Sequence, residues 1–131
     1  LVEGLHTLGE RDAAARLMPL AEMLERPDYR VGYRAAPPAA TAGIAAASAG
    51  AWDIAEAHFQ SAIALCDSVP VAHYQGRTRE WYADMLMLRD AGDDRARAAA
   101  LYAEAAESYD RVGLVLFAEQ LAVKRARPLV R

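Results

Sequence analysis

Residues 50–65 of the chain read GAWDIAEAHFQSAIAL, and this stretch decides the fold. Ala55, Phe59 and Ala62 are spaced by four and three residues, which places them on one stripe of a helix. The two alanines let a second helix approach closely, and the ring between them fills the groove. The same small–large–small spacing recurs in two further trios, Ala14, Met18, Ala21 and Ala98, Tyr102, Ala105.

Each trio follows a turn glycine, Gly9, Gly50 or Gly92, and another helical pattern precedes each turn. The unit is therefore helix, glycine turn, helix, present three times. Such hairpins bury their apolar faces only by stacking on one another. Because no useful strand pattern occurs, the sequence predicts an all-α solenoid of about three hairpins, with six to seven antiparallel helices in a right-handed stack.

Helical periodicity and turn residues set the boundaries of the expected elements. Pro19 predicts a kink, or a helix that starts near it, because proline removes a backbone donor. Asp94 is expected as an N-cap, and Gly113 as the residue that follows a helix end. The expected helices cover residues 13–24, 39–49, 52–66, 71–89, 94–112 and 114–127.

The 131 residues fit one domain, with repeat units at residues 1–25, 39–66 and 71–112 and a capping helix over 114–127. Hydrophobic residues make up 54% of the chain and charged residues 25%, which is typical of a soluble globular domain. The first residues lack Met and resemble the inside of a longer polypeptide more than a signal peptide. We therefore expect a fragment of a larger protein.

Charge, hydropathy and cysteine usage exclude several classes of partner. No apolar run reaches the ~18 residues of a transmembrane helix. The net charge of -3 favours neither a membrane nor direct nucleic-acid binding. The single cysteine indicates a reducing cytoplasm.

The small–large–small spacing after a glycine turn resembles the tetratricopeptide repeat. In the first helix, that family has a small residue preceded by a larger one and followed by an aromatic. This chain has Ala42, Gly43 and Ala46 at those places, which is a weaker match. The present units are longer than the ~34 residues of the family. Residues 49–67, AGAWDIAEAHFQSAIALCD, and residues 76–114, GRTREWYADMLMLRDAGDDRARAAALYAEAAESYDRVGL, supply a closer likeness. They are similar to the C-terminal helical region of bacterial signal-transduction ATPases, which include LuxR-type transcriptional regulators and nucleotide-cyclase-associated ATPases.

The resemblance covers roughly residues 13–123 and implies a region that acts through protein contacts beside a nucleotide-binding domain. The ATPase signature G-x-x-x-x-G-K-[ST] does not occur in this sequence. The resemblance therefore implies a cytoplasmic module of a transcriptional or signalling regulator, without the catalytic domain.

No constellation of catalytic or metal-binding residues stands out, and we expect no enzyme activity, cofactor or metal. The acidic pair Asp93 and Asp94 precedes a helix, where capping explains it. Cys66 has no basic neighbour and reads as a small core residue. Glu104 and Glu107 are expected on a solvated face. The three histidines are His6, His58 and His73, and no two of them have the four-residue spacing of a helical metal site.

Three groups of residues are candidates for contacts with partners. The first helix of each unit would line the inner groove, with Ala40, Ile44 and Ala47 in one unit and Arg77, Glu80, Asp84 and Met87 in the next. Trp52 and Trp81 suit ligand platforms but are more typical of core. Basic and aromatic residues alternate in a third segment, which contains Arg26, Tyr29, Arg30, Tyr33 and Arg34. This pattern suits nucleic-acid binding, but a surface loop explains it better.

The ends of a stack expose apolar faces unless polar caps cover them. We expect self-association through two such faces, formed by Leu1, Leu5 and Leu8 and by Leu114, Phe117 and Leu121. Two classes of function remain for the chain as a whole. One is a non-enzymatic protein–protein interaction module, whose partner is a separate protein or another domain of its parent chain. The other is a small-molecule sensor that binds an effector in the groove.

Overall fold

A computed structural model describes residues 1–24, 37–69 and 72–126, and 85% of these residues are helical. Within these ranges there are no strands, which confirms the all-α prediction. The described part contains eight helices rather than six or seven. They are α1 (Val2–Thr7), α2 (Arg11–Ala15), α3 (Met18–Leu24), α4 (Pro38–Ser48), α5 (Trp52–Ser68), α6 (Ala72–Arg89), α7 (Asp94–Val112) and α8 (Val115–Ala126).

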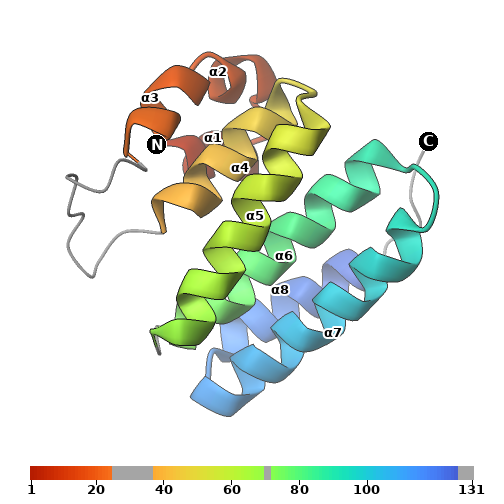
Figure 1. The fold of residues 1–131 in the computed structure, drawn as a ribbon. Coiled ribbons are helices and arrows are strands. Elements are labelled where there is room, and N and C mark those ends of the chain that lie inside the picture. Colours follow the sequence, from red (N-terminus) through yellow and green to blue (C-terminus); the bar gives the residue numbers. More distant parts are fainter. Residues whose placement is uncertain (25–36, 70–71, 127–131) are drawn as a thin grey trace.

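The extra helix arises because the expected helix over residues 13–24 is broken in two. Helix α2 ends at Ala15, and α3 begins at Met18 with Pro19 as its second residue. Proline is tolerated in a first turn, where its missing N–H has no helical acceptor to lose. The expectation of a helix that starts near Pro19 is confirmed. The three short helices pack against α4 (Figure 1).

Helices α4 to α8 alternate in direction along the chain (Figure 1). Gly50, Gly92 and Gly113 follow α4, α6 and α7 with φ values of 74°, 54° and 71°, which is left-handed backbone that glycine adopts without strain. Gly113 thus ends α7 as predicted. The helices on either side of each glycine contact one another, and α6 lies between α5 and α7.

The small–large–small trios are buried, as their spacing predicts. Ala55, Phe59 and Ala62 are at most 1% exposed, and Ala98, Tyr102 and Ala105 at most 9%. Of the first trio, Ala14 and Ala21 are buried, and Met18 is half-buried against the core.

Glycines in the first helix of two hairpins receive the large rings of the second. An added Cβ on Gly43 would lie 3.1 Å from ring carbons of Phe59. An added Cβ on Gly76 would lie 2.5 Å from Cε1 of Tyr109. Helices α6 and α7 can therefore approach closely only because residue 76 has no side chain.

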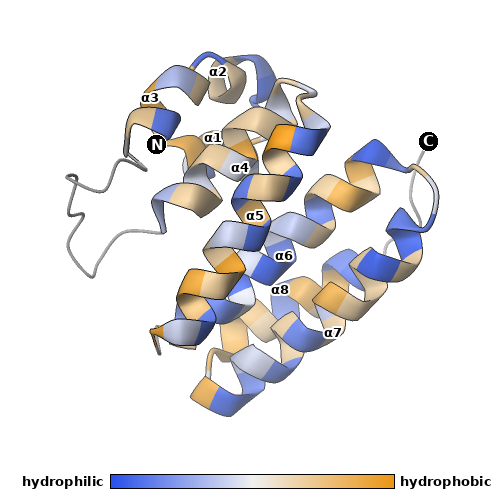
Figure 2. Ribbon diagram, in the orientation of Figure 1, coloured by the Kyte–Doolittle hydropathy of each residue, from blue (hydrophilic) through white to orange (hydrophobic). Residues whose placement is uncertain are grey.

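Helix α4 is enclosed by its neighbours. It contacts α1, α2, α3, α5 and α6, and its residues 42–47 are all buried. Figure 2 shows hydrophobic residues along most of α4, whereas hydrophobic and hydrophilic residues alternate along α7. Small side chains allow this enclosure, because alanine on every face leaves room for helices on several sides.

Several expected boundaries need correction. Helix α5 extends to Ser68, two residues beyond its predicted end. Helix α4 begins at Pro38, one residue earlier than predicted, because proline is well suited to the first helical position. Asp93, not Asp94, is the N-cap of α7, and its side chain makes no capping hydrogen bond. Asp94 is the first helical residue and is buried, 2% exposed. The arginine- and tyrosine-containing segment at residues 26–34 lies outside the described residues.

The expected apolar face of the last helix was assigned to the wrong side. Leu121 is 1% exposed, and Leu114 and Phe117 are half-buried, because this stripe packs against the rest of the bundle. The rings of Phe117 and Tyr109 lie 5.6 Å apart. The exposed apolar residues of α8 are Val115, Leu116 and Val123. At the other end Leu1 and Leu8 are exposed as expected, whereas Leu5 is half-buried.

Candidate functional site

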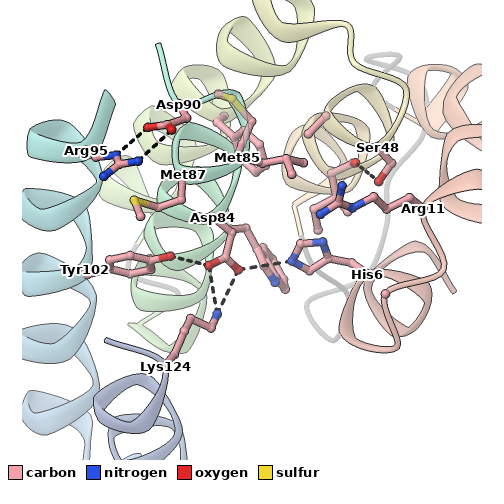
Figure 3. A pocket seen from close by; sticks show the side chains of 16 residues that line it. His6, Arg11, Ser48, Asp84, Met85, Met87, Asp90, Arg95, Tyr102 and Lys124 are labelled. Atoms are coloured by element: carbon pink, nitrogen blue, oxygen red, sulfur yellow. Dashed lines mark hydrogen bonds and ion pairs between the residues drawn. The ribbon is translucent and has the colours of Figure 1, made fainter. Parts of the chain in front are cut away.

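A pocket of about 520 Å³ lies among helices from both ends of the chain (Figure 3). Its apolar lining comes mainly from α4 and α6 and consists of Ile44, Ala47, Phe59, Trp81, Met85, Met87 and Leu88. Its polar side chains come from α1, α2, α4, α6, α7, α8 and the turn after α6, and they are His6, Arg11, Ser48, Asp84, Asp90, Arg95, Tyr102 and Lys124. An apolar surface with a few convergent polar groups is typical of binding sites.

Asp84 of α6 is the centre of the polar side of this pocket. Its carboxylate accepts hydrogen bonds from Tyr102 Oη at 2.7 Å and from Lys124 Nζ at 3.0 Å. His6 Nε2 lies 3.3 Å from the second oxygen of the same carboxylate. Figure 3 shows that the three partners approach Asp84 from α7, α8 and α1. One side chain of α6 therefore links the two helices that follow it with α1, which is remote in sequence.

Glu80 lies one turn before Asp84 on α6 and extends this network into the interior. It is 4% exposed, and it accepts hydrogen bonds at 2.5 Å from Tyr109 Oη and Lys124 Nζ. Arg77 lies 3.3 Å from the same carboxylate. The Arg77 guanidinium also lies over the Trp81 and Phe117 rings, 4.8 and 4.9 Å from their centroids. A buried carboxylate is tolerated here because each oxygen has a donor.

Burial and neighbouring charges shift the pKa values of these groups. Burial opposes ionisation of Asp84, but His6, Lys124 and Tyr102 outweigh burial and hold its pKa below the usual value. Burial and the Glu80 carboxylate raise the pKa of Tyr109, so its hydroxyl stays a neutral donor. The network therefore favours an ionised Asp84 and a neutral Tyr109.

The predicted groove residues are brought together only in part. Of the predicted set on α6, Asp84 and Met87 line the pocket, whereas Glu80 is buried behind it and Arg77 stacks on rings. From the earlier unit, Ile44 and Ala47 line the pocket. Asp84 and Glu80, which sequence reasoning offered to a partner, are bound by side chains of this chain instead.

A second network joins α5, α6 and α7 away from this pocket. Glu56 accepts hydrogen bonds from Tyr82 Oη at 2.7 Å and from Arg89 at 2.8 Å, and it also pairs with Arg97. Asp94 binds Arg89 through two hydrogen bonds of 2.7 and 2.8 Å and accepts the Ala91 N–H. This is why Asp94 is buried, and the network is structural because its carboxylates are bound within the chain.

The pKa values of the two carboxylates reflect these bonds. Burial would raise the pKa of Glu56, but hydrogen bonds from Tyr82, Arg97 and Arg89 outweigh burial and lower it to about 2. Hydrogen bonds from Arg89 prevail over burial at Asp94 and lower its pKa to about 2. Both groups are therefore ionised at neutral pH.

The remaining candidate residues have structural surroundings. Cys66 is buried beside Thr78, and burial raises the pKa of its thiol, which agrees with a core residue. Trp81 is 2% exposed and belongs to the core, although part of it reaches the pocket wall, and Trp52 is half-buried against the core. Glu104 is exposed and pairs with Arg79 at 2.8 Å.

The histidines occupy different surroundings. His6 faces Asp84, and the His73 ring lies 4.0 Å from the ring of Tyr74. Across residues 1–24, 37–69 and 72–126, no cluster of three or more His, Cys, Asp or Glu side chains is arranged to hold a metal ion.

Of the polar residues that line the pocket, sequence reasoning proposed only Asp84. It missed seven others, which are His6, Arg11, Ser48, Asp90, Arg95, Tyr102 and Lys124. The sequence contained one signal of this network. Glu80 and Asp84 are four residues apart, and they lie among residues that are buried in α6. Acids on a buried face require cationic or hydroxyl partners. The spacing alone did not say which helices supply them.

None of the described helices combines the length and the apolar character needed to cross a bilayer. Comparison with known proteins gave no significant match to a family model, a curated protein or a solved structure.

Proposed function

We propose that this chain is a non-enzymatic protein–protein interaction module from a cytoplasmic bacterial regulator of transcription or signalling. Its hairpins form a tetratricopeptide-like solenoid, and the pocket beside Asp84 receives a segment of a partner protein or of another domain of the parent chain. Support for the solenoid comes from the buried trios and from alternating helices that pack on their neighbours in sequence.

The observation that carries this proposal is the composition of the pocket. Seven apolar side chains line it, of which Met87 and Leu88 are the more exposed, beside polar groups that already bind one another. Asp84, Tyr102 and Lys124 are held by mutual hydrogen bonds, so none of them is poised as a nucleophile with an adjacent base. A fixed polar rim beside an apolar surface suits recognition of another chain.

The test uses a displayed library of random peptides selected on the 131-residue chain. Ser48 lines the pocket, so Ser48→Trp should fill part of it and weaken the selected peptides by about tenfold or more. Ser61→Trp is the matched control, because Ser61 is exposed on α5. Circular dichroism melts confirm that both variants fold. Equal peptide binding by the two variants would place the interaction elsewhere.

A small-molecule sensor is the second candidate, and the pocket volume favours it. About 520 Å³ lies within the range of ~300–1,000 Å³ that small-molecule sites occupy. Calorimetric titration with ATP and cyclic nucleotides tests this alternative directly. Saturable one-to-one binding that Ser48→Trp removes would favour a sensor over an interaction module.

A further inference from the structure

The charges around the pocket leave one cation without a partner in the described part of the chain. Lys124 is bound by Asp84 and Glu80, and Arg95 is bound by Asp90 through hydrogen bonds of 2.6 and 2.8 Å. Arg11 lines the same pocket, and among the described residues no side-chain hydrogen bond or ion pair engages it. The pocket therefore keeps a local excess of positive charge at Arg11.

Arg11 also points where a ligand would lie. Figure 3 shows its side chain extending from α2 into the pocket, next to His6 and facing α6. His6 offers a second ring nitrogen besides the one near Asp84. The apolar residues Ile44 and Met85 line the same cavity. A guanidinium beside an apolar surface fits a carboxylate attached to a large apolar group.

We infer that the pocket binds a peptide segment in which an acidic residue lies next to large apolar side chains. The Arg11 guanidinium receives the carboxylate, and the apolar side chains lie against the apolar lining, where Met87 and Leu88 are more exposed than Ile44 and Met85. This inference rests on the proposed function, since it names the chemistry of the partner segment for the same pocket. Charge complementarity selects this occupant, because both pocket aspartates are already paired, Asp84 with Lys124 and Asp90 with Arg95, whereas Arg11 is not paired among the described residues.

The test begins with the composition of the peptides that the library yields. Enrichment of Asp or Glu beside Leu, Ile, Met or Phe is expected. One enriched peptide is then measured by fluorescence anisotropy against the wild-type chain and against Arg11→Gln. Both measurements are repeated with a peptide in which Asp or Glu is replaced by Asn or Gln. Arg16→Gln is the matched control, because Arg16 is exposed and lies outside the pocket.

Arg11→Gln should weaken the acidic peptide about tenfold and leave the amide peptide nearly unaffected, which is the coupling expected of a direct pair. Arg16→Gln should change the affinity for neither peptide. Higher salt should weaken only the acidic peptide, since the Debye length shortens from ~10 Å at 0.1 M to ~3 Å at 1 M.

Other outcomes separate this inference from the proposed function. Selected peptides that lack acids, or that bind Arg11→Gln as tightly as wild type, overturn the acidic-peptide inference and leave the interaction module intact. A library that yields no pocket-dependent peptide overturns both. Octanoate serves as a free amphipathic acid, and if it binds in the pocket where no peptide does, the ligand is a small molecule.

Discussion

Replacing Gly76 by alanine tests the close packing of α6 against α7. In a solvated helix this change stabilises, because alanine has a helix propensity about 1 kcal/mol better than glycine. Here the new Cβ would lie 2.5 and 2.7 Å from two carbons of the Tyr109 ring and 3.2 Å from the Ala105 carbonyl oxygen. The contact with the ring is too short to persist, so either the ring or a helix must move.

The ring has little freedom to move. Tyr109 is fully buried, its hydroxyl donates to Glu80 at 2.5 Å, and its ring packs against Phe117. Overpacking of this kind costs roughly 1–3 kcal/mol, and the upper part of that range applies because a backbone carbonyl is also close. After the gain in propensity, we expect Gly76→Ala to lower the free energy of unfolding by about 2 kcal/mol.

Two other helical glycines provide a graded control. Gly4 has no atom within 4 Å of an added Cβ, so Gly4→Ala should stabilise by about 0.5–1 kcal/mol. An added Cβ on Gly43 would lie 3.1 Å from the Phe59 ring, so the stability of Gly43→Ala should fall between those of the other two variants. Urea unfolding at constant m-value gives all three differences. A Gly76→Ala protein as stable as wild type would refute the close approach of α6 and α7.

Three further predictions concern the trios, acid stability and ligands. Ala55→Leu and Ala98→Leu should each cost roughly 1–3 kcal/mol in urea unfolding, whereas Ala57→Leu on the exposed face should not; unchanged stability in both buried variants would refute the phasing. The fold lowers the pKa values of Glu56 and Asp94 to about 2, from 4.5 and 3.8 in the unfolded chain. The ionised carboxylates therefore stabilise the folded state fully above pH 4.5, and this stabilisation is lost as the pH falls to about 2. Urea midpoints from pH 6 to 2 should fall steeply for wild type and less for Glu56→Gln, and equal slopes would contradict the role of this carboxylate. Calorimetry and elemental analysis should find neither tight ATP binding nor a stoichiometric metal, and a bound transition metal would overturn the reading of the chain as non-enzymatic.

Local patterns in the sequence were sufficient for the helices and for much of the core. The spacing of Ala55, Phe59 and Ala62 fixes which face of α5 is buried, because helical geometry alone relates these residues. The same holds for the end of α7 at Gly113, where a left-handed residue is needed. Such features depend on neighbours within a turn or two, which a single sequence contains.

The polar side of the pocket depends on contacts that no local pattern encodes. Lys124 reaches Glu80 and Asp84 from 44 and 40 residues away, and His6 reaches Asp84 from 78 residues away. The prediction that Leu121 is exposed was wrong for the same reason. Which face of α8 is covered depends on where that helix packs on the rest of the bundle. Asp94 similarly matched a capping pattern, but its carboxylate is bound by Arg89.

The packing of helices α3 to α8 mainly on their neighbours in sequence has a consequence for the order of folding. Contacts between consecutive helices close short loops, and chains rich in local contacts fold in microseconds to milliseconds. We expect the α6–α7 pair, with its buried Gly76 and Tyr109, to form early, because the two helices are consecutive and pack extensively on each other. The bond between His6 and Asp84 spans 78 residues and forms only after the intervening helices have docked. In native-state hydrogen exchange, the amides of α1 to α3 therefore open first, and those of α6 and α7 exchange through global unfolding.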